Sequence, residues 1–160
     1  ATLLFSRGMQ AVMAHRVAHE LWQDGDRNRA LAFKAVCSRI FSTDMHPAAK
    51  IGAGFWLDHG LGFVLGETSV IEDDVSIWHN VTLGSTLNDD GAMRHPHIGK
   101  GAVIGAGAIL LGGIKVGVGA NIGAGAIVVD DVPDGGLVIG QKAQNRGTAR
   151  ISFGKTDGLS

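Results

Sequence analysis

A six-residue period in the placing of apolar residues is the feature that most constrains the fold of this chain. Counted every sixth residue from Ile98 to Val128, the positions are aliphatic without exception. Counted the same way from Ile51 to Val81, they are apolar at all but Ser69. A period of six fits neither the 3.6 residues of a helical turn nor the alternation of a strand. It therefore indicates a repeat architecture, in which one short unit is stacked many times.

Glycine occupies a fixed place in the second of these two blocks. The chain has 25 glycines in 160 residues, which is roughly twice the ordinary share. Many of them follow an aliphatic position by three residues, at Gly101, Gly107, Gly113, Gly119 and Gly125. Because glycine accepts backbone angles that other residues resist, these positions predict tight corners. Short strands joined by such corners stack into a parallel β-helix.

The repeat also sets the predicted domain boundaries. Residues 1–43 show two stretches with apolar residues at three- and four-residue steps, which predicts a helical hairpin. Residues 44–140 are predicted to form the β-helix. The step from Val81 to Ile98 is not a multiple of six, so the polar segment 84–96 is expected to loop out of the stack. Residues 141–160 follow as a C-terminal tail.

Charge and cysteine content argue against several classes of protein. Fourteen basic residues stand against 15 acidic ones, so the net field favours neither nucleic acid nor a membrane surface. The lone Cys37, the lack of a membrane-length apolar run and the lack of a secretory signal pattern predict a cytoplasmic protein. His15 and His19 have the spacing of zinc ligands on a helix, but no third ligand is near. We therefore expect a solvated helix face there and assign no metal.

Reactive side chains gather in the first block and at the end of the inserted loop. They are Asp44, Asp58, His59, Glu67, Arg94 and His95. Local rules tend to be broken where function requires it. A histidine that acts as a general base needs a partner that holds its tautomer. Asp44 precedes His59 by a little less than three hexapeptides, so we expect its carboxylate directly above or below the imidazole, accepting the second N–H.

Six segments resemble serine O-acetyltransferase, the hexapeptide-repeat enzyme of the first step of cysteine synthesis from serine. They are Asp44 to Gly52, Leu57-Asp58-His59, Gly66-Glu67-Thr68, Val75-Ser76-Ile77, Val81 to Gly84 and Arg94-His95-Pro96. The resemblance implies a mainly β fold, a left-handed parallel β-helix preceded by a short α-helical hairpin. It further implies homotrimers, alone or paired into hexamers, with active sites between neighbouring subunits. The substrates would be L-serine and acetyl-CoA, the latter as co-substrate, with no metal, nucleic acid or membrane involved.

The resemblance also implies a role for each candidate. His59 matches the catalytic base that takes the proton from the serine hydroxyl, and Asp44 matches its carboxylate partner. The other residues that match the substrate site are Asp58 for the amino group of serine, Arg94 for its carboxylate, His95 as second active-site histidine and Glu67 as supporting carboxylate. The acetyl-CoA groove is expected at Gly84, Thr86, Gly105 and Ala106.

Three segments depart from the family pattern. Residues 1–43 match the last two helices of a longer helical domain. The loop lacks the family's lysine and has Met93 in place of an acid, which leaves open another small hydroxyl or amine compound as acceptor. The tail ends in Leu159-Ser160, not in the isoleucine that docks the family to the next enzyme, which argues against such docking. An inactive β-helix scaffold is the remaining alternative, and the reactive residues named above argue against it.

Overall fold

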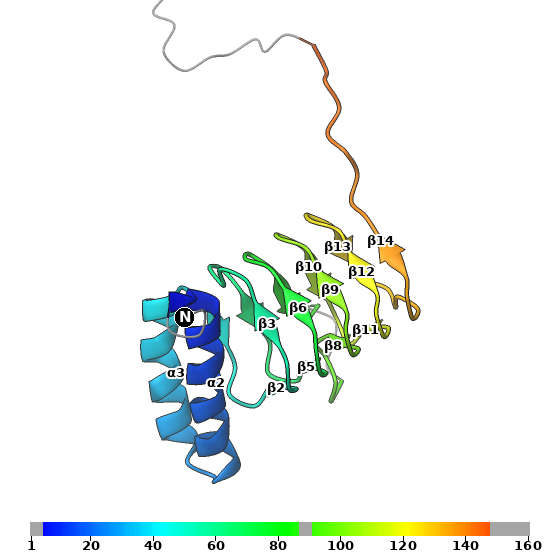
Figure 1. Ribbon diagram of the computed structural model, residues 1–160. Coiled ribbons are helices and arrows are strands. Elements are labelled where there is room, and N and C mark those ends of the chain that lie inside the picture. Colours follow the sequence, from blue (N-terminus) through cyan, green and yellow to red (C-terminus); the bar gives the residue numbers. More distant parts are fainter. Residues whose placement is uncertain (1–4, 87–90, 148–160) are drawn as a thin grey trace, which may run out of the picture.

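The computed structural model describes residues 5–86 and 91–147, in which two helices stand at one end of a stack of short strands (Figure 1). The helices are α2 (Arg7–Gln23) and α3 (Arg27–Phe41). The strands are β1 (Asp44–Met45), β2 (Lys50–Ile51), β3 (Trp56–Leu57), β4 (Val64–Leu65), β5 (Val70–Ile71), β6 (Ser76–Ile77), β7 (Thr82–Gly84), β8 (His97–Ile98), β9 (Val103–Ile104), β10 (Ile109–Leu111), β11 (Lys115–Val116), β12 (Asn121–Ile122), β13 (Ile127–Val128) and β14 (Leu137–Val138).

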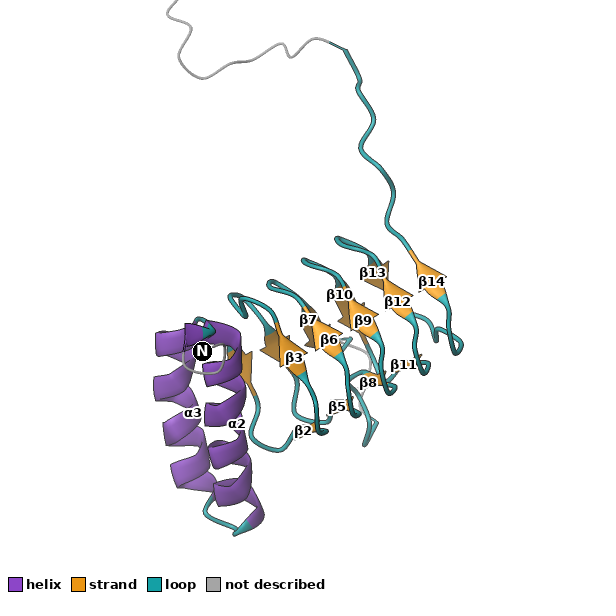
Figure 2. Cartoon of the chain, in the orientation of Figure 1, coloured by secondary structure: helices purple, strands orange, loops and turns teal. Residues whose placement is uncertain are grey.

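The strands form three parallel sheets that make up the sides of a coil (Figure 2). Sheet A has the order β1-β4-β7-β10-β13, sheet B the order β11-β8-β5-β2, and sheet C the order β14-β12-β9-β6-β3. From β1 to β13, successive strands along the chain pass from sheet A to B to C and back to A, and between β13 and β14 the side of sheet B is marked by a single bridge from Val132 to Val116. The predicted parallel β-helix is therefore confirmed, and its strands are too short to exist outside the stack.

The length of each coil follows from the strand register. Val64 pairs with Thr82, and Ile109 pairs with Ile127, so each of these coils is three hexapeptides long. The interval from Thr82 to its partner Ile109 is half as long again, because the inserted loop lies between β7 and β8. Asp44 pairs with Val64, two positions beyond the third hexapeptide, so the first coil also carries an excess.

The two extra residues of the first coil shift the six-residue spacing of the buried aliphatic residues. The inward residue of β3 is Leu57 and that of β4 is Leu65, and both are fully buried. The step between them exceeds the regular hexapeptide by two positions, so the corner at 58–63 is longer than the others. The six-residue count from Ile51 passes over this shift and reaches Ser69, a buried polar residue that lies just before its strand.

The helical hairpin is confirmed, and α2 turns mostly small residues toward the coil. Gly8, Ala11, Val12 and Ala18 are buried, whereas Met13 and Val17 are about half exposed. A Cβ atom at Gly8 would collide with the carbonyl oxygen of Leu57. The helix axis thus lies too close to the first coil for large side chains, which turn outward.

The C-terminal segment leaves the stack after β14 and has no regular secondary structure in its described part (Figure 1). Residues 148–160, including the Leu159-Ser160 end on which the docking prediction rests, lie outside the described residues. Neither α2 nor α3, the helices of the described chain, is long and apolar enough to cross a membrane.

Candidate active site

His59 lies in the long corner between β3 and β4, on the segment that the regular coil does not have. Its φ of 61° falls in the left-handed region, which costs a non-glycine residue roughly 1–2 kcal/mol. Two backbone hydrogen bonds fix the corner: Gly60 N–H donates to the Asp58 carbonyl at 2.7 Å and Gly62 N–H to the Ser42 carbonyl at 2.7 Å. The His59 side chain is 65% exposed. The fold therefore holds a strained backbone that presents this imidazole to solvent.

Two side chains contact the His59 ring. An Asp58 carboxylate oxygen, Oδ2, lies 3.4 Å from Nε2. The ring of His79, from the corner of the next coil, meets it edge to face with 5.6 Å between ring centroids. The Nδ1 atom of His79 is buried and has no hydrogen-bond partner among the described residues. The sequence could have indicated His79, because it follows β6 by the same number of residues as His59 follows β3.

A hollow of about 620 Å³ opens beside this corner. Asp58 and Arg7 bring opposite charges to it, and His59 is part of its lining. Its lining is Phe5, Ser6, Arg7, Trp56, Asp58, His59 and Leu61. Charges of both signs beside an exposed imidazole suit a small zwitterionic substrate.

The expected hydrogen bond between Asp44 and His59 is not formed. Asp44 lies on β1 and makes an ion pair with Lys34 of α3. Because the first coil is two positions longer than three hexapeptides, the register places Asp44 beneath Val64, beyond the corner that carries His59. The carboxylate beside the imidazole in this structure is that of Asp58.

Arg94 and His95, at the end of the inserted loop, lie against the corner Gly66-Glu67-Thr68 that follows β4. The Arg94 guanidinium donates to Glu67 Oε2 at 2.6 Å. This hydrogen bond holds the pKa of Glu67 below its usual value. A second hollow, of about 330 Å³, lies beside this corner and is lined in part by Glu67, Thr68 and Met93.

His95 is buried, and its ring is held from one side by Thr68. The backbone N–H of Thr68 donates to His95 Nδ1 at 3.2 Å, and the Thr68 hydroxyl oxygen lies 2.9 Å from the same nitrogen. The ring also lies directly on Gly66, where a Cβ atom would overlap it. Sequence reasoning named His95 and Glu67 but missed the contribution of Thr68 and Gly66, because neither residue has a charged side chain that would mark it as a site residue.

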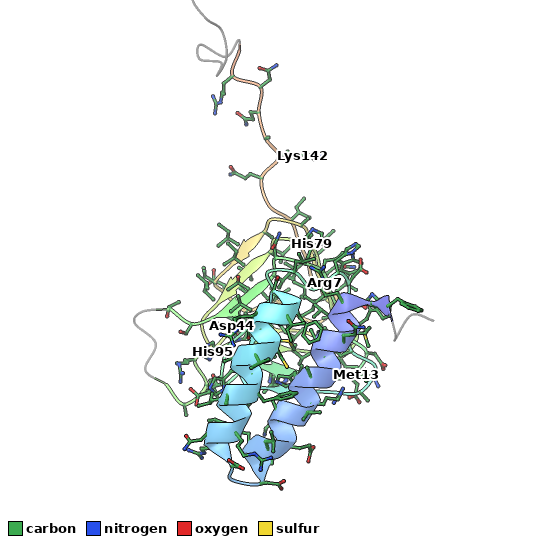
Figure 3. The ribbon with its side chains drawn as sticks, turned by 90° about the vertical axis from the view of Figure 1, so that its left-hand side faces the viewer. Arg7, Met13, Asp44, His79, His95 and Lys142 are labelled. Carbon is green, nitrogen blue, oxygen red and sulfur yellow. The ribbon has the colours of Figure 1, made fainter. Side chains whose placement is uncertain are left out.

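The structure therefore splits the predicted site residues into two groups within one chain. His59 and Asp58 lie at the corner where sheet C leads into sheet A, whereas Arg94 and His95 lie at the corner where sheet A leads into sheet B. His79, which contacts His59, and His95 lie well apart across the coil stack in Figure 3. Each group has its own hollow, and the five-stranded sheet A separates them.

The outward face of sheet A differs from that of sheet B. Its stacked outward residues include Val64, Thr82, Ile109 and Ile127, with Ile127 69% exposed. The corresponding ladder of sheet B is Lys50, Val70, His97 and Lys115. Sheet A thus presents a mostly aliphatic strip between the two groups of reactive residues.

The four positions expected at the acetyl-CoA groove lie on both sides of sheet A. Gly105 and Ala106 form a corner above His79, since Gly107 N–H donates to the His79 carbonyl at 3.0 Å. Gly84 ends β7, and Thr86 lies exposed two residues beyond it. Within residues 5–86 and 91–147, no group of three or more His, Cys, Asp or Glu residues is placed to hold a metal ion.

The histidines of α2 do not form the solvated face that was expected. His15 is 5% exposed and its Nε2–H donates to the His46 carbonyl at 3.1 Å, while His19 Nδ1 lies 2.7 Å from the Pro47 carbonyl. Burial lowers the pKa of His15 to about 4, so the ring is neutral at pH 7. These contacts attach α2 to the first coil close to the corner that holds Arg94, and they serve packing.

Comparison with known proteins places this architecture among acetyltransferases, although no family model matches the sequence. Serine acetyltransferase 5 of Arabidopsis thaliana is 54% identical over 142 residues, covering 89% of this chain and 45% of that protein. The crystal structure of the Neisseria gonorrhoeae serine acetyltransferase in complex with serine superposes with a TM-score of 0.84, at 46% identity over 90% of this chain and 58% of the other. The Brucella abortus serine acetyltransferase in complex with coenzyme A gives 0.83, at 44% identity over 92% and 59%.

These matches bear on the fold as well. The three parallel sheets and two helices match the left-handed β-helix of the solved acetyltransferases, as the resemblance implied. The chain spans about half the length of the curated relatives it matches, between 40% and 57% for the first of them. The similarity covers both corners that carry the reactive residues.

Proposed function

Because this chain belongs to the serine acetyltransferase family, we propose that it transfers the acetyl group of acetyl-CoA to the hydroxyl of L-serine. The observation that carries the proposal is the exposed His59 with Asp58 beside it, in a hollow that also contains Arg7. Related enzymes have been solved with serine and with coenzyme A bound, which supports both substrates. The cytoplasmic location expected from the single cysteine stays a prediction.

The active site of the proposed enzyme is completed by a neighbouring subunit. In a cyclic trimer, the corner with His59 of one subunit meets the corner with Arg94 and His95 of the next. The aliphatic strip of Val64, Ile109 and Ile127 supports this arrangement, because it lies between the two corners and would be buried by the contact. Pairing of such trimers into hexamers is compatible with the exposed apolar residues of α2 and α3, such as Val36 and Ile40.

In the proposed reaction, His59 acts as general base. Its neutral ring takes the proton from the serine hydroxyl as the oxygen attacks the thioester carbonyl carbon of acetyl-CoA. The tetrahedral intermediate collapses when the carbon–sulfur bond breaks, and the departing thiolate takes the proton from the imidazolium. Asp58, whose Oδ2 atom lies 3.4 Å from His59 Nε2, is placed to stabilise the imidazolium that forms during the reaction. The products are O-acetylserine and coenzyme A.

The charged groups around this centre hold the two ends of the amino acid. Asp58 faces the ammonium group, and Arg94, oriented by Glu67, faces the carboxylate. Asp44 is the carboxylate that the family resemblance assigns to His59, and it reaches the ring only by leaving Lys34. Gly105 and Ala106, which follow His79 in the column of corners, give the pantetheine arm a surface with no side chain larger than a methyl group, and Gly84 and Thr86 border it from the neighbouring subunit.

Release of free thiol from acetyl-CoA, measured against a panel of acceptors, tests this proposal. We expect turnover with L-serine. The panel includes other amino acids, hydroxylated metabolites and small amines, because Met93 lines the hollow beside Glu67 where the family has an acid. Preference for one of these would correct the acceptor, and no turnover with any of them would favour an inactive scaffold.

A further inference from the structure

The corner Gly66-Glu67-Thr68 holds the end of the inserted loop through hydrogen bonds that Glu67 and Thr68 accept from Arg94 and His95. Glu67 accepts a hydrogen bond from the Arg94 side chain. The Thr68 hydroxyl accepts from the backbone N–H groups of both Arg94 and His95, each at 3.1 Å. One hydroxyl thus fixes the backbone of two neighbouring residues at the point where the inserted loop returns to the coil.

The hydrogen-bond inventory of Thr68 determines the protonation of the His95 ring. A hydroxyl has one hydrogen to donate, and the oxygen of Thr68 already accepts two bonds. Its hydrogen is therefore directed to His95 Nδ1, 2.9 Å away. The Thr68 backbone N–H, which cannot accept, also points at Nδ1 from 3.2 Å. With two donors aimed at it, Nδ1 is the unprotonated nitrogen, and the proton of the neutral ring lies on Nε2.

We propose that Thr68 is a positioning residue that locks His95 in the Nε2–H tautomer and, with Gly66, fixes the plane of its ring. Gly66 acts by leaving space, since a Cβ atom there would overlap the imidazole. No positive φ is required at this position, so the glycine serves the ring and not the backbone. An imidazole that must present one defined nitrogen to a substrate gains from such a second contact.

The expected effect on kcat rests on the proposed function, in which His95 is part of the substrate site. The assignment of the His95 tautomer does not depend on that function. Two readouts therefore separate the proposals. Nitrogen-15 spectra of histidine-labelled protein report which ring nitrogen of His95 carries the proton, with the His95 signals assigned from a His95→Gln variant. Thiol release reports kcat and the KM for each substrate.

Three variants form the test. Thr68→Val removes the hydroxyl at constant shape, Thr68→Ser keeps it, and Ser69→Ala removes a neighbouring buried hydroxyl that has no hydrogen-bond partner in the described chain. Thr68→Val leaves the backbone N–H of residue 68 as the remaining donor to Nδ1, so the Nε2–H tautomer is expected to lose part of its population. We expect kcat to fall roughly 10- to 1,000-fold, since a wrong tautomer in a catalytic triad costs about 10⁴. Thr68→Ser and Ser69→Ala are expected to keep the wild-type tautomer and kcat within about threefold.

Thermal unfolding followed by circular dichroism shows whether Thr68→Val retains the coil, and Gly66→Ala gives a second route to the same ring. Gly66→Ala is expected to shift the His95 nitrogen signals and lower kcat while Nδ1 still receives the Thr68 hydroxyl. An unchanged tautomer in Thr68→Val would overturn the proposal, and so would equal losses in Thr68→Val and Ser69→Ala. If the wild-type protein releases no thiol from acetyl-CoA, the proposed function fails, and the nitrogen spectra alone decide the role of Thr68.

Discussion

The two blocks of the coil share their backbone but differ at the corners between sheets C and A. In the second block these corners read Gly105-Ala106-Gly107 and Gly123-Ala124-Gly125, with φ near 70° at Gly107 and Gly125. In the first block the same place in the turn is taken by Gly62, with a φ of 68°, and by Asn80, with a φ of 57°. His59, with a φ of 61°, lies three residues before Gly62, in the part of the long corner that the regular coil does not have. The second block is scaffold, and the first adds its reactive histidine in residues beyond the shared turn.

The two blocks also differ in how regular they are. From β8 to β13 the strands follow one another at six-residue steps. The first block and its junction depart from this step twice, at the long corner 58–63 and at the loop 84–96. His59 lies in the first departure and Arg94 with His95 in the second. Reactive residues therefore occur where additional residues extend outward from the stack. Their side chains can contact a substrate there without disturbing the buried core.

Replacing His59 is expected to have the largest effect, since it removes the base and leaves the turn intact. His59→Asn should lower kcat by roughly 10² to 10⁴ because asparagine tolerates the left-handed backbone but cannot take a proton. Thiol release from acetyl-CoA measures this.

The matched control is His97, which also pairs with a carboxylate, Glu72, at 2.8 Å but faces outward from sheet B. His97→Gln is expected to keep kcat within about threefold of wild type, as surface changes usually do. A His59→Asn enzyme as active as the His97→Gln enzyme would remove His59 from the base role.

Mixing two inactive variants tests whether the corner 58–63 of one subunit and the loop 84–96 of its neighbour form one active site. His59→Asn and Arg94→Ala should each be nearly inactive. Unfolded and refolded together in equal amounts, they should regain about one quarter of wild-type activity, because one site in four then combines an intact His59 with an intact Arg94 from its neighbour. Mixing without refolding is the control. A site built within one chain would give no recovery in the refolded mixture.

The two blocks together were enough to predict the fold, and the first block with its loop indicated most of the reactive residues, but not their arrangement. Aliphatic spacing and corner glycines predicted the coil because stacking alone satisfies a six-residue period. The expected Asp44–His59 hydrogen bond is not formed in this structure, where Asp44 pairs with Lys34, because a count in hexapeptides does not register the two extra positions before Leu65. The one polar position in the count, Ser69, was the sign of that shift. The role of Asp44 as the partner of His59 stays a prediction. Thr68 and His79 were missed because their roles depend on neighbours from other coils.

Acid is expected to affect the first block before the second, because only the first is attached to the helices through a buried histidine. The pKa of His15 falls from 6.5 to about 4 on folding. Between these values the unfolded chain binds a proton that the folded chain does not, so the free energy of unfolding falls as pH falls from 6.5 to 4. The slope from this group is at most about 1.4 kcal/mol per pH unit.

His15→Gln keeps a donor for the His46 carbonyl and removes the titration, so it provides the comparison. Urea unfolding at pH 7, 6, 5 and 4 should show a shallower loss of stability in His15→Gln than in the wild type. Hydrogen exchange at pH 5 should show α2 opening before β9 to β12. Equal slopes for the two proteins would mean that His15 does not govern this attachment.

The smallest expected effect concerns the left-handed backbone at His59, compared with a left-handed glycine at a corner of the second block. His59→Gly relieves a left-handed residue and should raise the free energy of unfolding by up to about 1 kcal/mol, with part of the gain offset by the greater freedom of glycine in the unfolded chain. Gly101→Ala makes the reverse change at a φ of 67°, where an added Cβ atom meets no neighbour, and should lower stability by about 1 kcal/mol with kcat unchanged. Urea unfolding measures both. Opposite signs would show that the fold bears a stability cost at His59 because the reaction requires a side chain there, whereas a loss of stability in His59→Gly would mean that the contacts with Asp58 and His79 outweigh the strain of the turn.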